Sequence, residues 1–113
     1  NITNGDFFRW QNLWPTLAAV FDMPAAPPRD VRLTEAMADA DGLWDRLVEE
    51  HGLVANRLSE MVSWAFADYV FNTTWDVMAD TLKCRQFGFY EFIDSEQMLV
   101  DRLIEMRRLR IIP

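Results

Sequence analysis

The chain has 113 residues, of which half are hydrophobic and 13% aromatic, and its formal net charge is −7. This hydrophobic content excludes an intrinsically disordered chain, and the acidic balance argues against binding to nucleic acid or to an anionic membrane surface. No apolar run reaches the roughly 18 residues of a membrane-spanning helix. The single cysteine, Cys84, excludes an internal disulfide bond and fits a reducing compartment, so a cytoplasmic location is expected.

The N-terminal segment has no initiator methionine and no targeting character, and we expect it to follow an upstream domain. Residues 1–3 are predicted to be the end of a strand. The Asn-Gly pair after them is predicted to form a tight turn. Apolar residues at helical spacing predict the first helix from Trp10 to Asp22. Pro15 is expected to kink the first turns or to restart the helix, because proline removes a backbone donor.

Two short helices are predicted in the middle of the chain, after a possible edge strand over residues 30–33. Thr34 is a suitable N-cap for a helix that reaches about Asp39. Asp41 can cap the next helix, which runs to His51 and stops at Gly52 in the usual C-terminal position.

The segment from Leu58 to Phe71 is predicted as one helix and as the most buried element of the chain. Seven of its apolar side chains recur at spacings of three and four, while Trp64 and Phe71 lie on a second face. A helix that is apolar on two faces is covered on two sides. In so small a chain, one of those sides is expected to be a pocket or the place of a missing neighbour.

A short strand is predicted over residues 75–78, followed by a turn of helix over residues 82–86. Asp80 is expected to cap that turn, and Gly88 to close it.

The last helix begins with the capping box Asp94-Ser95-Glu96-Gln97 and is expected to end near Leu109. A cluster of basic residues at its end is expected to complement the helix dipole rather than to bind nucleic acid. The cluster consists of Arg107, Arg108 and Arg110.

These elements predict an α+β fold that is mainly helical, with two or three short strands, in a single domain over residues 1–113. In an intact enzyme the strands would extend or border the sheet of a doubly wound domain.

Four segments of the sequence, in this order, resemble one family. The family is the atypical short-chain dehydrogenase/reductases of the progesterone 5β-reductase and iridoid synthase type, whose bacterial relatives are usually called NAD-dependent epimerase or aldehyde reductase-like proteins. The matching segments are Asn-Ile-Thr-Asn-Gly-Asp-x-Phe-x-Trp-x-x-Leu-Trp at residues 1–14, Val-Ser-Trp-Ala-Phe-Ala-Asp at 62–68, Lys-Cys-Arg-Gln-Phe-Gly-Phe at 83–89, and Ile-Ile-Pro at 111–113.

The resemblance implies the C-terminal, substrate-binding lobe of a Rossmann-type reductase, whose N-terminal domain binds NAD or NADP. The family's Tyr-x-x-x-Lys pair is absent, because Tyr69 and Tyr90 are followed four residues later by Thr73 and Asp94. The four glycines are scattered singly, so the chain has no phosphate-binding loop. With only one histidine, His51, a histidine metal cluster is also excluded. We therefore predict no catalytic, cofactor-binding or metal-binding residue in this chain.

The resemblance implies that Phe66 lines the substrate pocket, because it occupies the place of the family's pocket aromatic. The alternative is that Phe66 belongs to the core, since it fits the apolar seam of its helix. Trp64 is a weaker candidate for the same pocket. Asp68 is expected to form a structural ion pair with an arginine or lysine, because a buried carboxylate needs a partner.

The predicted function is the substrate-binding portion of an NAD(P)-dependent oxidoreductase or epimerase-like protein. The resemblance implies hydride transfer to a small carbonyl or enone compound, with no catalysis by this chain alone. The expected partners are the N-terminal Rossmann domain of the same protein, a small-molecule substrate and a second copy of the chain. The alternative is a small helical interaction module, whose aromatic face docks a partner protein.

Overall fold

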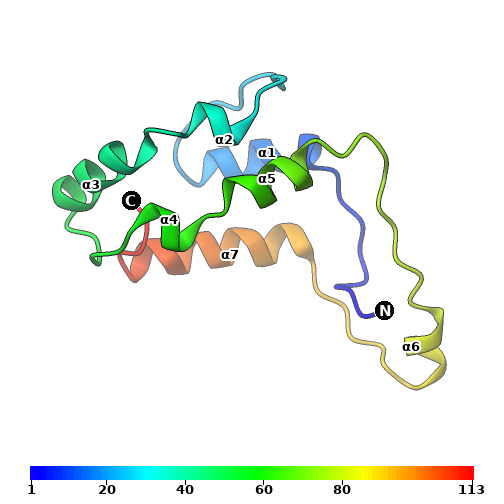
Figure 1. The fold of residues 1–113 in the computed structure, drawn as a ribbon. Coiled ribbons are helices and arrows are strands. Elements are labelled where there is room, and N and C mark those ends of the chain that lie inside the picture. Colours follow the sequence, from blue (N-terminus) through cyan, green and yellow to red (C-terminus); the bar gives the residue numbers. More distant parts are fainter. The chain divides into compact units, whose positions relative to one another are not determined.

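The computed structural model describes all residues from 1 to 113 and contains seven α-helices and no strand (Figure 1). No helix has both the length and the apolar character needed to cross a membrane. The helices are α1 (Trp10–Ala19), α2 (Leu33–Ala36), α3 (Ala40–His51), α4 (Leu58–Met61), α5 (Trp64–Phe71), α6 (Leu82–Gln86) and α7 (Ser95–Arg108).

The chain divides into two compact units, and α7 contributes to both. The first unit comprises Asn1–Pro27 and Trp75–Ile104, and the second comprises Pro28–Thr74 and Glu105–Pro113. A single domain over residues 1–113 stays a prediction.

In the first unit, the N-terminal segment is fastened to the start of α7. The Asp6 carboxylate accepts hydrogen bonds from the backbone N–H of Ser95 and from its hydroxyl, both at 2.7 Å. The Asn4 side-chain amide donates to the same hydroxyl at 2.9 Å. Ser95 is only 4% exposed, and the helix beginning there is capped further by Asp94, which accepts from the Gln97 N–H. Carboxylates at a helix N-terminus satisfy free backbone donors, so this contact fixes both segments.

The other contacts that hold the first unit together lie mainly at its surface. Leu13 on α1 is its one buried hydrophobic side chain. Arg9, just before α1, forms a two-pronged ion pair with Asp76, and both side chains are more than half exposed. Asp80 accepts from the Leu82 N–H at 2.8 Å at the start of α6, which confirms its predicted capping role.

The second unit is built around Trp44 on α3, which is 8% exposed. The Trp44 indole N–H donates to the side-chain oxygen of Asn56 at 3.0 Å, and the Asn56 amide donates to the Val54 carbonyl. The Val54 N–H in turn donates to the carbonyl of Arg110, just after α7. As predicted, α3 ends at Gly52, whose φ of 58° lies in the left-handed region that favours glycine.

The prediction of two or three strands, and with it the α+β class, is wrong: the fold is helical. Residues 1–3, 30–33 and 75–78 form no sheet, because a strand needs a ladder of hydrogen bonds to a neighbouring strand. The extended segments make only isolated backbone bonds, such as Ile93 N–H to Asn4 and Val54 N–H to Arg110.

The predicted helix over residues 58–71 is also wrong, because it is interrupted between α4 and α5. Val62 and Ser63 are extended, and the Ser63 hydroxyl accepts from the Phe66 N–H as the N-cap of a new helix. Serine competes for backbone donors in this way, which favours a cap over a helix interior. The segment is not the most buried element either, since neither α4 nor α5 has a buried residue.

Three further helix boundaries differ from the sequence prediction. The first helix ends at Ala19 rather than Asp22, since Asp22 has a φ of 54°, and it runs through Pro15 without restarting. Thr34 lies inside α2 and Asp41 lies inside α3, so neither is the N-cap of its helix.

We predict that Gly5→Ala destabilises the protein. Gly5 has a φ of 92°, and an added Cβ would lie 2.6 Å from Cδ1 of the Phe92 ring. Strain and overlap together should lower the free energy of unfolding by roughly 1–3 kcal/mol. Thermal or denaturant unfolding measures the change.

Gly42→Ala is the matched control for this substitution. Gly42 lies in the first turn of α3 and has no atom within 4 Å of an added Cβ. Alanine there should leave stability unchanged or raise it by up to about 1 kcal/mol. Equal unfolding midpoints for the two variants would contradict the role assigned to Gly5.

Candidate functional site

The two predicted site residues lie on α5, but the structure does not bring them together. Phe66 is 65% exposed, whereas Trp64, the first residue of the helix, is half-buried. Each helical residue is rotated by about 100° from the last, so residues two apart point to opposite sides. The exposure of Phe66 also shows that it is not a core residue of this chain.

An exposed aromatic pair on α5 includes Tyr69, which the sequence did not single out as a pocket residue. The rings of Phe66 and Tyr69 have centroids 6.4 Å apart and are tilted by 32°. Tyr69 is 76% exposed. The spacing of three residues is the signal that places both on one face, because side chains at that spacing are neighbours on a helix. Together they form an apolar surface that is open to a ligand or to another part of the protein.

Asp68 on α5 holds the start of α2. One carboxylate oxygen accepts from the Leu33 N–H at 2.6 Å. The other accepts from the Thr34 N–H at 3.1 Å and from the Thr34 hydroxyl at 2.8 Å. These bonds satisfy backbone donors at the start of a short helix, which has no side-chain cap of its own at Arg32.

The expected ion pair of Asp68 with an arginine or lysine is therefore replaced by a helix cap. The backbone N–H groups of Leu33 and Thr34 are the main cause that lowers the pKa of Asp68 below its ordinary value of 3.8, and the positive charge of Arg32 adds a smaller effect. Asp68 is partly exposed, so it did not need a charged partner.

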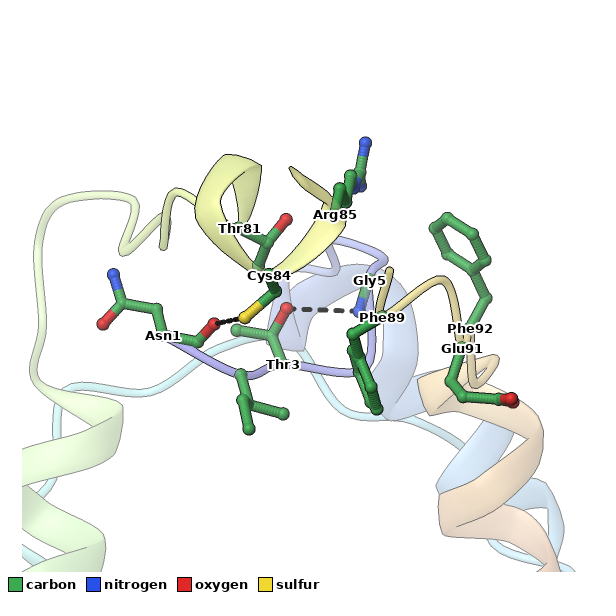
Figure 2. Close-up of a pocket in the computed structure, with 10 residues that line it drawn as sticks. Asn1, Thr3, Gly5, Thr81, Cys84, Arg85, Phe89, Glu91 and Phe92 are labelled. Carbon is green, nitrogen blue, oxygen red and sulfur yellow. Dashed lines mark hydrogen bonds between the residues drawn. The ribbon is translucent and has the colours of Figure 1, made fainter. Parts of the chain in front are cut away.

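Two hollows lie in the first unit, and neither contains Phe66 or Trp64. In the smaller one, α6 lies over the N-terminal residues, and the Cys84 thiol donates to the Asn1 carbonyl oxygen at 2.6 Å (Figure 2). It has room for no more than about one water molecule. The other is an open depression between the side chains of Phe7, Phe8, Phe92 and Ile93, with three carboxylates at its edge.

The carboxylates beside the open depression already have partners within the chain. Asp6 accepts from Ser95, Asp94 from Gln97, and Glu96 from the Thr16 hydroxyl. Hydrogen bonds from the Ser95 N–H and hydroxyl lower the pKa of Asp6. No group of three or more potential metal ligands occurs in the structure. These acidic side chains thus act as helix caps and surface contacts.

Comparisons with known proteins assign the chain to a family. No family model matches. The chain is 34% identical to an (S)-8-oxocitronellyl enol synthase of Antirrhinum majus, 32% identical to one of Catharanthus roseus, and 30% identical to the short chain dehydrogenase gsfE of Penicillium aethiopicum. Each match covers the whole chain, which spans only 30% of the length of the two plant enzymes and 34% of the fungal protein.

The chain belongs to the iridoid synthase-type short-chain dehydrogenase/reductases, as a C-terminal portion of such a protein. This confirms the resemblance that the sequence indicated. The names of the relatives also support an oxidoreductase family. Whether Phe66 and Trp64 contact a substrate stays a prediction.

We predict that acid weakens both carboxylate caps. The folded-state pKa values of Asp6 and Asp68 lie below the ordinary value of 3.8. Their stabilising contribution is therefore complete above that value and is lost as the pH falls through the lower, folded-state pKa values. Thermal unfolding followed from about pH 6 to about pH 2 should show the loss.

The double variant Asp6→Asn/Asp68→Asn is the control for this experiment. Asparagine does not titrate, so the variant should be less stable near neutral pH and should lose less stability on acidification. A variant that loses as much stability as the wild type would show that other carboxyl groups dominate.

Proposed function

We propose that the chain is the substrate-side portion of an NAD(P)-dependent reductase of the short-chain dehydrogenase type. The complete protein transfers a hydride from NADH or NADPH to a small carbonyl or enone compound. The observation that carries this proposal is the match of the whole chain to (S)-8-oxocitronellyl enol synthases. Epimerase-like chemistry, which the resemblance of the sequence to epimerase-like proteins implies, is the alternative reaction.

The proposal assigns different tasks to the two parts of the protein. The cofactor and the hydride transfer belong to an N-terminal Rossmann domain, which carries the glycine-rich loop and the Tyr-x-x-x-Lys pair. This chain contributes a wall of the substrate site and has no catalysis of its own. Its many exposed large apolar side chains support such a partner, because surface of this kind is costly to leave in water.

Phe66 is the residue that we propose to contact the substrate, with Trp64 as a weaker candidate. An exposed aromatic ring offers a flat apolar surface to a small unsaturated ligand. The neighbouring Tyr69 ring widens that surface. We also propose that the protein is cytoplasmic, on the grounds of its single free cysteine, and that it forms homo-oligomers through apolar surface left uncovered.

The first test uses the isolated chain. We expect it to bind neither NADH nor NADPH at micromolar concentration and to transfer no hydride, because it lacks a loop that would hold the pyrophosphate. Fluorescence or calorimetric titration measures binding, and the full-length protein is the positive control. Binding by the isolated chain, or no binding by the full-length protein, would contradict the division of tasks. In the second case the interaction-module alternative gains support.

The second test is Phe66→Ala in the full-length protein. We expect weaker use of the carbonyl substrate, with an increase of roughly tenfold in KM, because contact with the ring is lost. The unfolding temperature should change by only a few degrees, since the side chain is 65% exposed in this chain. A buried phenylalanine would instead cost about 3–5 kcal/mol of stability.

Phe87→Ala is the matched control, because Phe87 is 83% exposed and lies outside α5. It should leave the KM for the carbonyl substrate unchanged. A large loss of stability in Phe66→Ala, without a specific effect on KM, would show that Phe66 is a packing residue of the complete protein.

A further inference from the structure

The carboxylate of Asp68 connects two helices that lie in contact with each other. Its three hydrogen bonds reach the Leu33 N–H, the Thr34 N–H and the Thr34 hydroxyl. Helix α2 has four residues, too few to be stable alone. Neither α2 nor α5 contains a buried residue. These hydrogen bonds therefore help to fix the position of α2 beside α5, in addition to the contact between the two helices.

Asp68 lies between the two exposed aromatic residues in the sequence but points away from Phe66. They are two positions apart along the helix, which places their side chains on opposite sides. The start of α5 is held by a separate contact, because the backbone N–H of Phe66 donates to the hydroxyl of Ser63, the N-cap of the helix. A carboxylate in this place can orient the helix without touching a ligand on the aromatic face.

We propose that Asp68 is a positioning residue for the substrate wall, holding α2 against α5 so that α5 presents Phe66 and Tyr69 in one fixed orientation. This inference rests on the proposed function, because it assigns the aromatic face to substrate binding. Asp68 itself contacts no reacting atom. Its effect on the reaction passes through the placement of α5.

The experiment is Asp68→Asn in the full-length protein. Asparagine has nearly the same shape but only one acceptor oxygen, so it cannot keep all three hydrogen bonds. We expect KM for the carbonyl substrate to rise by roughly threefold to tenfold with kcat little changed, because a binding surface is misplaced rather than a reacting group lost. KM for the nicotinamide cofactor, NADH or NADPH, should stay the same.

Amide hydrogen exchange supplies a readout that is independent of activity. The amides of Leu33 and Thr34 should exchange faster in Asp68→Asn, because at least one of them loses its acceptor. Asp76→Asn is the matched control: Asp76 is also a partly exposed carboxylate with a two-pronged partner, Arg9, but it lies in the first unit. It should change neither the exchange at α2 nor the KM for the carbonyl substrate.

Milder changes at Thr34 keep the test decisive if Asp68→Asn does not fold. Thr34→Val removes only the hydroxyl bond to Asp68 and should raise the same KM by a smaller factor. Thr34→Ser keeps the hydroxyl and should restore the wild-type value. If Asp68 only stabilised the fold, its loss would affect the KM for the cofactor as well as the KM for the carbonyl substrate.

The outcomes separate this proposal from the proposed function. Faster exchange at α2 together with a specific rise in KM supports the positioning role. Faster exchange with an unchanged KM overturns it, and so does unchanged exchange in a folded variant. A wild-type protein that reduces no carbonyl or enone compound overturns the proposed function itself, and the positioning role with it.

Discussion

Aspartate carboxylates that bind the starts of helices hold this chain together. Asp6 and Asp94 cap α7, Asp80 caps α6, and Asp68 reaches from α5 to cap α2. The buried hydrophobic side chains are only Leu13 and Trp44. Since so little apolar surface is removed from water, the places where segments meet are set by hydrogen bonds to free backbone donors. The acidic residues thus stabilise the fold as helix caps, and the stability of the fold should fall at acid pH.

Because so few side chains are buried, many aromatic residues of this chain are exposed. Side chains such as Phe66, Tyr69, Trp75 and Phe87 are at least 65% exposed. Single exposed apolar residues are ordinary, but a chain with this many needs a covering surface. The relatives are about three times as long as this chain, which supports a further domain as that cover in the proposed enzyme.

Local signals predicted some helix starts and stops correctly and missed others, since the expected cap Thr34 lies inside α2. The capping box at Asp94, the glycine stop at Gly52 and the cap at Asp80 are all present. Patterns that extend over longer segments led to wrong predictions. The apolar seam over residues 58–71 predicted one buried helix, yet Ser63 divides it and none of the residues of α4 or α5 is buried. Extended segments were predicted as strands, although nothing in a local pattern shows whether a pairing partner exists.

The sequence by itself determined the family, the helical character of most segments and the placement of Phe66 on a helix. These properties depend on residue order and on side chains a few positions apart, so they can be read locally. Only the tertiary structure decided that Phe66 and Tyr69 are exposed and that Asp68 caps a helix more than thirty residues earlier. Exposure and long-range hydrogen bonds depend on which distant segments meet, and that is a property of the folded chain rather than of any local pattern.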